Sequence, residues 1–216
     1  MRKIFIVIAV VLAANLTWAQ SDAKATQILE EVSAKTKTFK SMSADFVFAM
    51  DNDEMDIHEK DEGTIIVKGQ KYVVKLPGSG IEVFSDGQTI WTYMKDGNQV
   101  TISSLEDSEN ELMDPSSIFS IYERGFRSQF VAETQEGNKT LYKINLFPDE
   151  EEYQVTKIEV AIDKATLMLS SATLYATDEN LYSIVVKKME PNKVFSDSDF
   201  VFDESKYGDL EVIDFR

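Results

Sequence analysis

The stretch SDGQTIWTYMKDGNQV, residues 85–100, places an apolar run between two Asp-Gly pairs. Asp and Gly tolerate the positive φ angles that tight hairpin turns require. The stretch therefore predicts a strand over TIWTYM, residues 89–94, with a hairpin turn and a further strand on each side. Hairpins joined by such short turns are typical of a curved antiparallel sheet or barrel.

Upstream, residues 21–39 read SDAKATQILEEVSAKTKTF and predict a helix with Ser21 or Asp22 as its N-cap. Its apolar side chains recur at helical spacing and form one stripe: Ala25, Ile28, Leu29, Val32 and Thr36. From Met42 the period changes to two, and SADFVFAM at residues 43–50 predicts a strand with alternate residues on one face: Ala44, Phe46, Phe48 and Met50.

Further runs with strand character follow along the chain, separated by polar turns. They read GTIIVKGQKYVVKL (63–76), IEVF (81–84), SQFVAET (128–134), TLYKINLFP (140–148), YQVTKIEVAID (153–163), LMLSSATLYAT (167–177), LYSIVVKKME (181–190) and FVF (200–202). A second, short helix is predicted over Pro115–Glu123, capped by Asp114. The end of the chain reads as a polar tail that contains Val212, Ile213 and Phe215.

About eleven strands with two helical segments predict a mainly β fold, an unclosed and strongly curved antiparallel β-barrel covered by an α-helical lid. No repeat or linker divides the chain, so residues 20–216 are expected to form one domain. Residues 1–19 read as a signal peptide: Arg2 and Lys3 are followed by the apolar run Ile4–Leu12 and by Thr17-Trp18-Ala19. A transmembrane anchor is the alternative, but the run is short for a bilayer core of about 30 Å.

The composition excludes several classes of chemistry. The chain has no Cys, hence no disulfide, thiolate nucleophile or lipid-bearing cysteine, and its single His is His58 in a polar turn. We therefore expect no catalytic residue, no metal site and no cofactor. The acidic turns, Asp51–Asp56 and Asp149–Glu152, lack the pattern of a calcium loop and are read as solvated.

The net charge is −16, or −18 once Arg2 and Lys3 are removed with the signal peptide. Such a charge keeps a protein soluble and repels nucleic acid and anionic lipid surfaces. Nucleic acid is therefore not an expected partner.

The quoted stretch resembles the signature of the LolA-type periplasmic lipoprotein carriers, in which an Asp-Gly turn leads into a Trp-x-Tyr strand and then Gln-Val. FKSMSADF (39–46) is similar to the first strand of that family and EGTIIVKGQKYVVKL (62–76) to its second and third. A helix with Pro115 and Phe119 follows, and DSDFVFDESKYGDLEVIDFR (197–216) is similar to the family's closing segment. The resemblance covers nearly the whole mature chain in the right order.

This resemblance implies a LolA/LolB-like fold and a function. A soluble, monomeric, periplasmic protein, not an enzyme, would receive the acyl chains of lipoproteins from an inner-membrane lipoprotein-releasing transporter and deliver them to an outer-membrane acceptor. One departure concerns Gly69-Gln70, where family members often carry Arg-Pro. That Arg is implicated in holding the lid closed, and Gln lacks the donor fork of a guanidinium.

The candidate ligand-binding residues are the apolar residues expected on the sheet face that meets the helices. From the sheet these are Phe46, Phe48, Ile66, Tyr72, Val74, Trp91, Tyr93, Ile158 and Val160, and from the lid they are Ile28, Val32, Ile118, Phe119 and Tyr122. Each could instead belong to an ordinary packed core, because periodicity assigns faces without showing whether the space between them is filled.

Three other functions remain open on the sequence. The same fold could carry a glycolipid or an apolar small molecule. A secreted hydrolase would need a carboxylate pair in the cavity, whereas most acids fall in turns. A structural interaction module would have a filled interior.

Overall fold

The computed structural model describes residues 22–106, 125–149 and 154–216. A helix covers residues 22–36, as the apolar stripe predicted, and the rest is mainly β. The strands are β1 (Met42–Asn52), β2 (Ile57–Lys68), β3 (Lys71–Leu76), β4 (Ile81–Ser85), β5 (Thr89–Met94), β6 (Gln99–Ser104), β7 (Phe126–Glu136), β8 (Lys139–Pro148), β9 (Val155–Asp163), β10 (Met168–Ala176), β11 (Leu181–Pro191) and β12 (Glu211–Asp214). The second predicted helix, Pro115–Glu123, lies outside the described residues.

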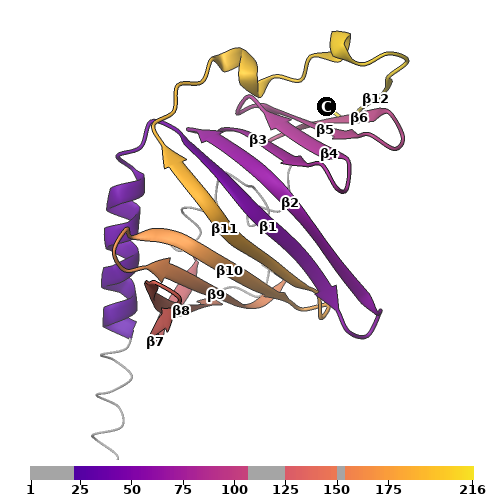
Figure 1. Cartoon of the computed structure of the whole chain (residues 1–216). Coiled ribbons are helices and arrows are strands. Elements are labelled where there is room, and N and C mark those ends of the chain that lie inside the picture. Colours follow the sequence, from indigo (N-terminus) through magenta and orange to yellow (C-terminus); the bar gives the residue numbers. More distant parts are fainter. Residues whose placement is uncertain (1–21, 107–124, 150–153) are drawn as a thin grey trace, which may run out of the picture.

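The twelve strands form one sheet in the order β12-β6-β5-β4-β3-β2-β1-β11-β10-β9-β8-β7. Every neighbouring pair is antiparallel except β12, which runs parallel to β6. The sheet bends strongly, so that β3–β6 and β7–β9 lie at opposite ends of the long strands β1, β2 and β11 (Figure 1). Because β12 and β7 are the two ends of the order, the sheet is not closed into a barrel. The predicted fold class is confirmed.

Both hairpins of the opening stretch are present. Around the first Asp-Gly pair, the Asp86 carboxylate accepts hydrogen bonds from the backbone N–H groups of Gln88 (2.9 Å) and Thr89 (2.8 Å), and Gly87 adopts a φ of 90°. At the second turn it is Asn98, with a φ of 44°, that takes the left-handed conformation. These local bonds explain why such short segments turn the chain without distorting the strands.

Strand register divides the sheet into two faces, because residues directly opposite each other on neighbouring strands point to the same side. Ala44 lies opposite Ile65, and Ile65 opposite Val74. Across the β1–β11 pair, Phe48 lies opposite Ile184. We call this the inner face, because it continues onto the β8–β10 surface that the helix covers, and we call the opposite one the outer face.

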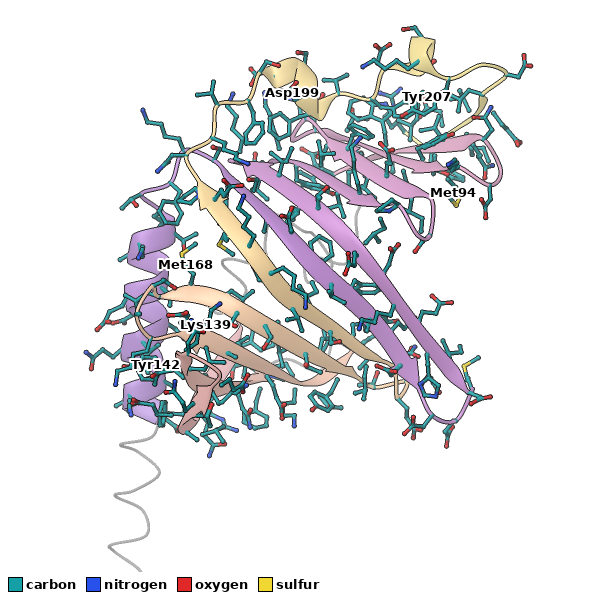
Figure 2. All side chains as sticks on the ribbon, in the orientation of Figure 1. Met94, Lys139, Tyr142, Met168, Asp199 and Tyr207 are labelled. Carbon is teal, nitrogen blue, oxygen red and sulfur yellow. The ribbon has the colours of Figure 1, made fainter. Side chains whose placement is uncertain are left out.

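The helix of residues 22–36 buries its apolar stripe on the inner face of β8, β9 and β10. Ala25, Ile28, Leu29 and Val32 form one core with residues of β8 and β9, each at most 8% exposed: Ile144, Leu146, Val155, Ile158, Val160 and Ile162. Figure 2 shows Tyr142 among the side chains between these strands and the helix. The inner face of β8 and β9 is therefore filled beneath the helix.

A different element covers the outer face of β2–β6. Residues 192–210, which we call the C-terminal segment, include two short 3₁₀ helices, η5 (Asp197–Phe200) and η6 (Glu204–Lys206). Its aromatic side chains pack on the strands, with the Tyr207 ring 4.4 Å from that of Tyr93 and the Phe202 ring 5.6 Å from that of Phe84, centroid to centroid. Figure 2 shows Tyr207 in the layer between this segment and β4–β6.

Polar contacts hold the C-terminal segment at both ends. The Asp197 carboxylate lies 2.9 Å from Lys68 Nζ and 3.2 Å from Lys71 Nζ, and the two ammonium groups lower its pKa. At the other end, Asn98 Nδ2 donates to the carbonyl groups of Gly208 (2.6 Å) and Asp209 (3.0 Å). The chain then enters β12. The sequence had predicted a polar tail for these residues instead of a strand.

Phe200→Ala should lower the free energy of unfolding by about 3–5 kcal/mol, because Phe200 is completely buried and truncation leaves a cavity. Urea denaturation followed by circular dichroism measures this change. Val194→Ala is the matched control: Val194 is 98% exposed, so its effect should stay within about 0.5 kcal/mol. Equal stabilities of the two variants would contradict a packed role for the C-terminal segment.

Candidate functional site

The inner face carries a second apolar cluster beyond the part that the helix fills. Its buried members are Ala44, Phe46, Ile65, Val67 and Tyr72. Around them lie apolar side chains that are only partly buried: Phe48, Val74, Leu76, Val83, Ile184, Val186 and Met189. We call this set the inner apolar patch. It spans β11, β1, β2, β3 and β4, so the sheet presents there a wide apolar surface that its own packing leaves incompletely covered.

Close packing within the inner apolar patch depends on a glycine. A Cβ atom at Gly63 would lie 2.6 Å from the ring of Phe46 and 2.8 Å from Leu76 Cδ2. The missing side chain thus lets Phe46 and Leu76 lie across β2. Beside them, the rings of Phe48 and Tyr182 stack at a centroid distance of 6.4 Å.

The structure distributes the predicted ligand-binding residues over several environments. Phe46, Phe48, Tyr72 and Val74 belong to the inner apolar patch. Ile158 and Val160 pack instead with Ile28 and Val32 in the sealed core beneath the helix. The predicted lid residues Ile118, Phe119 and Tyr122 lie outside the described residues. Contact of any of these residues with a ligand stays a prediction.

Three residues were expected on the wrong face. Trp91 lies opposite Phe84, Phe84 opposite Val73, and Val73 opposite Ile66. That row is on the outer face, as is Tyr93. The C-terminal segment covers it, so Ile66, Trp91 and Tyr93 contribute to a separate core with Phe200 and Phe202. The expectation failed because alternation assigns two faces but does not say which of them a distant segment will cover.

Sequence reasoning missed the contribution of β11 to the inner apolar patch. Tyr182, Ile184 and Val186 lie opposite Met50, Phe48 and Phe46 respectively. The alternation of these three residues in LYSIVVKK was a signal for one face, but the sequence could not show that β11 pairs with β1. This pairing places a strand from the end of the fold in the middle of the sheet.

The helix is attached to the sheet by polar as well as apolar contacts. Lys24 Nζ lies 3.6 Å from the centroid of the Phe130 ring on β7, a favourable cation–π geometry. Thr26 Oγ1 is 3.3 Å from Ser128 Oγ, and Lys35 Nζ donates to the carbonyl of Thr166.

Gln70 belongs to the Gly69-Gln70 pair, at which family members often carry Arg-Pro. Its side chain is exposed in the β2–β3 turn, next to Gly87.

No group of three or more His, Asp or Glu side chains in residues 22–106, 125–149 and 154–216 could hold a metal ion. His58 Nδ1 lies 3.0 Å from Asp51 Oδ1 at the exposed end of the β1–β2 hairpin.

Among the described residues, no helix is long and apolar enough to span a membrane.

Asp61 on β2 holds the turn between β3 and β4. Its carboxylate accepts hydrogen bonds from the backbone N–H groups of Gly78 (3.1 Å) and Ser79 (2.8 Å) and from Ser79 Oγ (2.8 Å). Burial alone would raise the pKa of Asp61, but the hydrogen bonds from Ser79 and Gly78 outweigh it and lower the pKa below 3.8. The turn at the edge of the inner apolar patch is thereby fixed by a charged group.

Comparison with known proteins agrees with this architecture. Residues 37–203 match the family model described as "Outer membrane lipoprotein carrier protein LolA". The outer-membrane lipoprotein carrier protein of Psychromonas ingrahamii is 32% identical over 111 residues. That alignment spans about half of each chain, 50% of this one and 52% of the relative.

Solved structures support the fold alone, since their sequence identities are low. An uncharacterized conserved protein from Thermus thermophilus has a TM-score of 0.58 at 14% identity, covering 88% of this chain and 99% of that one. A DUF1329 family protein from Desulfovibrio piger has a TM-score of 0.51 at 11% identity, covering 87% and 99%.

Gly63→Val should destabilise the protein by about 1–3 kcal/mol, because the new side chain overlaps Phe46 and Leu76 and forces both to move. The midpoint of urea unfolding reports the loss. Gly208→Ala serves as the control: nothing lies within 4 Å of its added Cβ, so stability should hardly change. A fully stable Gly63→Val variant would contradict the packing described for the patch.

Asp61→Asn should cost about 1 kcal/mol of stability at pH 7, because one anionic acceptor of three hydrogen bonds is lost. The pKa of Asp61 is lower in the folded state than its ordinary value of 3.8, so its stabilisation is present above that pH and disappears as the pH falls through the folded value. Denaturation curves between pH 7 and pH 2 should therefore converge for wild type and variant. Asp53→Asn, at an exposed position of the same hairpin, is the control and should change stability at pH 7 by no more than about 0.5 kcal/mol; a difference for Asp61→Asn that is the same at every pH would contradict the assignment.

Proposed function

We propose, from the premise that this chain belongs to the LolA family of outer membrane lipoprotein carrier proteins, that it is a periplasmic carrier which binds the acyl chains of lipoproteins on its inner apolar patch. Family membership rests on the match over residues 37–203. The observation that carries the site is the group of partly buried apolar side chains on β1, β3 and β11, among them Phe48, Val74 and Ile184. They offer apolar surface beside a helix that already fills the adjoining part of the inner face.

Physical chemistry explains why such a surface would suffice without catalysis. Each methylene group transferred from water to an apolar site contributes on the order of 0.8 kcal/mol, so a molecule with several acyl chains does not cross an aqueous compartment unaided. A carrier needs an apolar face, a rigid frame around it and an exterior that avoids the membrane. The members of the inner apolar patch are apolar side chains, which suits the binding of acyl chains.

The net charge of −16 supports the idea that loading and unloading occur through proteins. An acidic exterior is repelled by anionic lipid surfaces. We therefore propose that a monomer takes its cargo from an inner-membrane lipoprotein-releasing transporter and passes it to an outer-membrane acceptor, without contact with nucleic acid.

The attachment of the helix bears on how cargo would enter. Ala25, Ile28, Leu29 and Val32 are almost completely buried against β8 and β9. Lifting this helix would expose all of them together with the sheet core beneath, at a cost of several kcal/mol. We propose that residues 22–36 stay docked while acyl chains enter beside them.

The direct test is native mass spectrometry of the mature protein purified from its own periplasm, followed by extraction of whatever is bound. A co-purifying lipoprotein is the expected result. A glycolipid or another amphiphile would keep the site and replace the cargo. A protein that is empty and accepts no acylated peptide in vitro would overturn the carrier proposal.

Ile184→Asp should abolish binding of a synthetic tripalmitoylated peptide, because a carboxylate in the middle of the inner apolar patch would have to be desolvated by the bound acyl chain. Displacement of a fluorescent fatty acid measures this binding. Val185→Asp is the matched control: the adjacent residue on β11 points to the outer face and is 43% exposed, so binding should persist. Equal loss in both variants would contradict the assignment of the inner face.

A further inference from the structure

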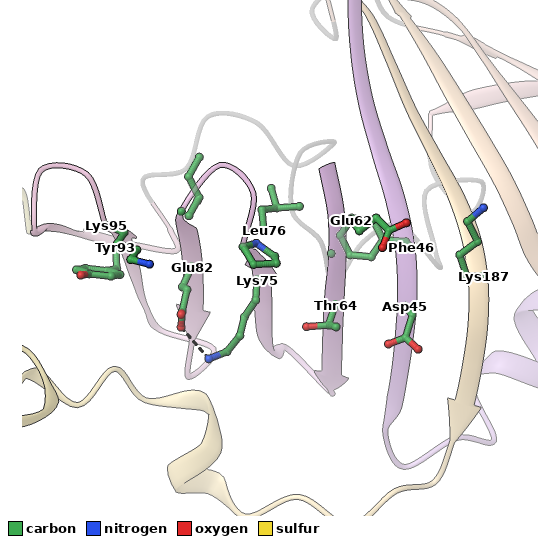
Figure 3. Close-up of a pocket in the computed structure, with 14 residues that line it drawn as sticks. Asp45, Phe46, Glu62, Thr64, Lys75, Leu76, Glu82, Tyr93, Lys95 and Lys187 are labelled. Carbon is green, nitrogen blue, oxygen red and sulfur yellow. Dashed lines mark hydrogen bonds and ion pairs between the residues drawn. The ribbon is translucent and has the colours of Figure 1, made fainter. Parts of the chain in front are cut away.

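A pocket of about 610 Å³ lies on the outer face of β1–β4, beside the C-terminal segment. Figure 3 shows Asp45, Thr64, Lys75 and Glu82 in a row across neighbouring strands, with the C-terminal segment running below them. The register confirms that they share one face: Asp45 lies opposite Thr64, Thr64 opposite Lys75, and Lys75 opposite Glu82. We call this the outer pocket.

The charged groups of the outer pocket are only partly satisfied by one another. Lys75 Nζ and Glu82 Oε2 form an ion pair at 2.7 Å. Glu62 and Lys187 also line the pocket and are exposed, and within the described residues neither takes part in a side-chain ion pair. The lining is balanced between Lys75, Lys95 and Lys187 on one side and Asp45, Glu62 and Glu82 on the other, in a chain whose net charge is −16.

A bulge in β11 sets the position of Lys187. Asp45 lies opposite Lys188 and the next residue, Phe46, opposite Val186, so Lys187 is an extra residue with no partner on β1. Bulges of this kind re-aim a side chain and are common next to functional sites. The irregularity places an additional ammonium group at the end of the row.

The outer pocket is also in contact with the inner face. Leu76 and Ile81, which lie opposite each other on the inner face, line it together with Pro77 and Gly80 of the turn between β3 and β4. A ligand whose apolar part lies on the inner apolar patch can therefore continue around the end of this hairpin and reach the row of charged residues.

The pocket chemistry narrows the class of ligand. Three carboxylates disfavour a polyanion, and no metal-binding cluster exists in the described part of the chain. A ligand with charges of both signs and a hydrogen-bonding backbone fits best. From β4 to β1 the row crosses three strand intervals, about 14 Å, which is the length of about four residues of extended polypeptide.

We infer that the outer pocket binds the first residues of the polypeptide that follows the lipid-modified end of the cargo. The inference rests on the proposed function and deepens it: acyl chains occupy the inner apolar patch, and the attached peptide passes around the β3–β4 turn into a charge-balanced pocket. Discrimination by this pocket favours protein-linked lipids over glycolipids of equal acyl content.

Three synthetic probes test the inference: tripalmitoylated cysteine amide, the same lipid followed by Ser-Lys-Gly-Glu-Ser, and the same lipid followed by Ser-Gln-Gly-Gln-Ser. Dissociation constants come from displacement of a fluorescent fatty acid. The charged peptide should tighten binding by about tenfold, the effect of two favourable partly exposed ion pairs. The variant Glu62→Gln/Lys187→Gln should lose this gain and bind the lipid amide as wild type does. The control Glu54→Gln/Lys139→Gln changes exposed charges outside the pocket and should keep the gain.

The outcomes separate the two proposals. Wild-type protein that binds all three probes equally would overturn the outer pocket as a peptide site and leave the carrier function standing. A gain that survives in Glu62→Gln/Lys187→Gln would likewise place the peptide elsewhere. Failure to bind even the lipid amide would overturn the carrier function and the inference together.

Discussion

The fold depends on the alternation of side chains along an unclosed sheet, which creates two apolar surfaces that must be covered independently. In β2, Ile65 and Val67 face inward whereas Ile66 faces outward, so this strand needs partners on both sides. The helix of residues 22–36 covers one end of the inner face, and the C-terminal segment covers the outer face at the other end. Within the described residues, neither of these two elements covers the inner apolar patch. Within the described residues, the candidate site is therefore the part of the inner face that no second element seals, although three of its strands, β2, β3 and β4, also contribute to the outer core.

The sequence predicted most of the architecture because its signals are local. Asp86-Gly87 and Asp96-Gly97 specify hairpins, and the stripe of Ile28, Leu29 and Val32 specifies a helix that needs a surface. The faces were harder to assign. Runs such as Ile65-Ile66-Val67 are apolar on both sides, and alternation alone does not reveal that Phe200 and Phe202, far along the chain, cover one of them. Trp91 and Tyr93 were assigned to the inner face for this reason, although they stabilise the outer core. The pairing of β11 with β1, which completes the candidate site, is a long-range contact that no local pattern encodes.

The C-terminal segment changes the interpretation of the family-like signature around Trp91. The strand TIWTYM carries Trp91 and Tyr93 on its outer face, where they contact the segment that leads to β12. Asn98 connects the two further, since its side chain binds Tyr93 Oη at 3.2 Å and also the carbonyl groups of Gly208 and Asp209. The signature therefore specifies the attachment of the chain end to the sheet. Its link to the proposed lipid binding is indirect: a fixed β4–β6 end supports the strands that carry the inner apolar patch.

In this arrangement, the helix and the C-terminal segment hold the fold together, whereas the inner apolar patch stays partly exposed. The helix and the C-terminal segment are both fastened by aromatic or aliphatic cores and by specific polar contacts, such as Lys24 on Phe130 and Asp197 between Lys68 and Lys71. A carrier that opened by releasing either element would expose a core and lose much of the 5–15 kcal/mol that typically stabilises a domain. Binding on surface that is already partly exposed avoids that loss, because the ligand then covers apolar side chains such as Phe48 and Ile184 without first uncovering others. Under the proposed function, the frame would remain folded in the empty and in the loaded state, and the affinity for cargo would be set by the apolar area that the described elements leave uncovered.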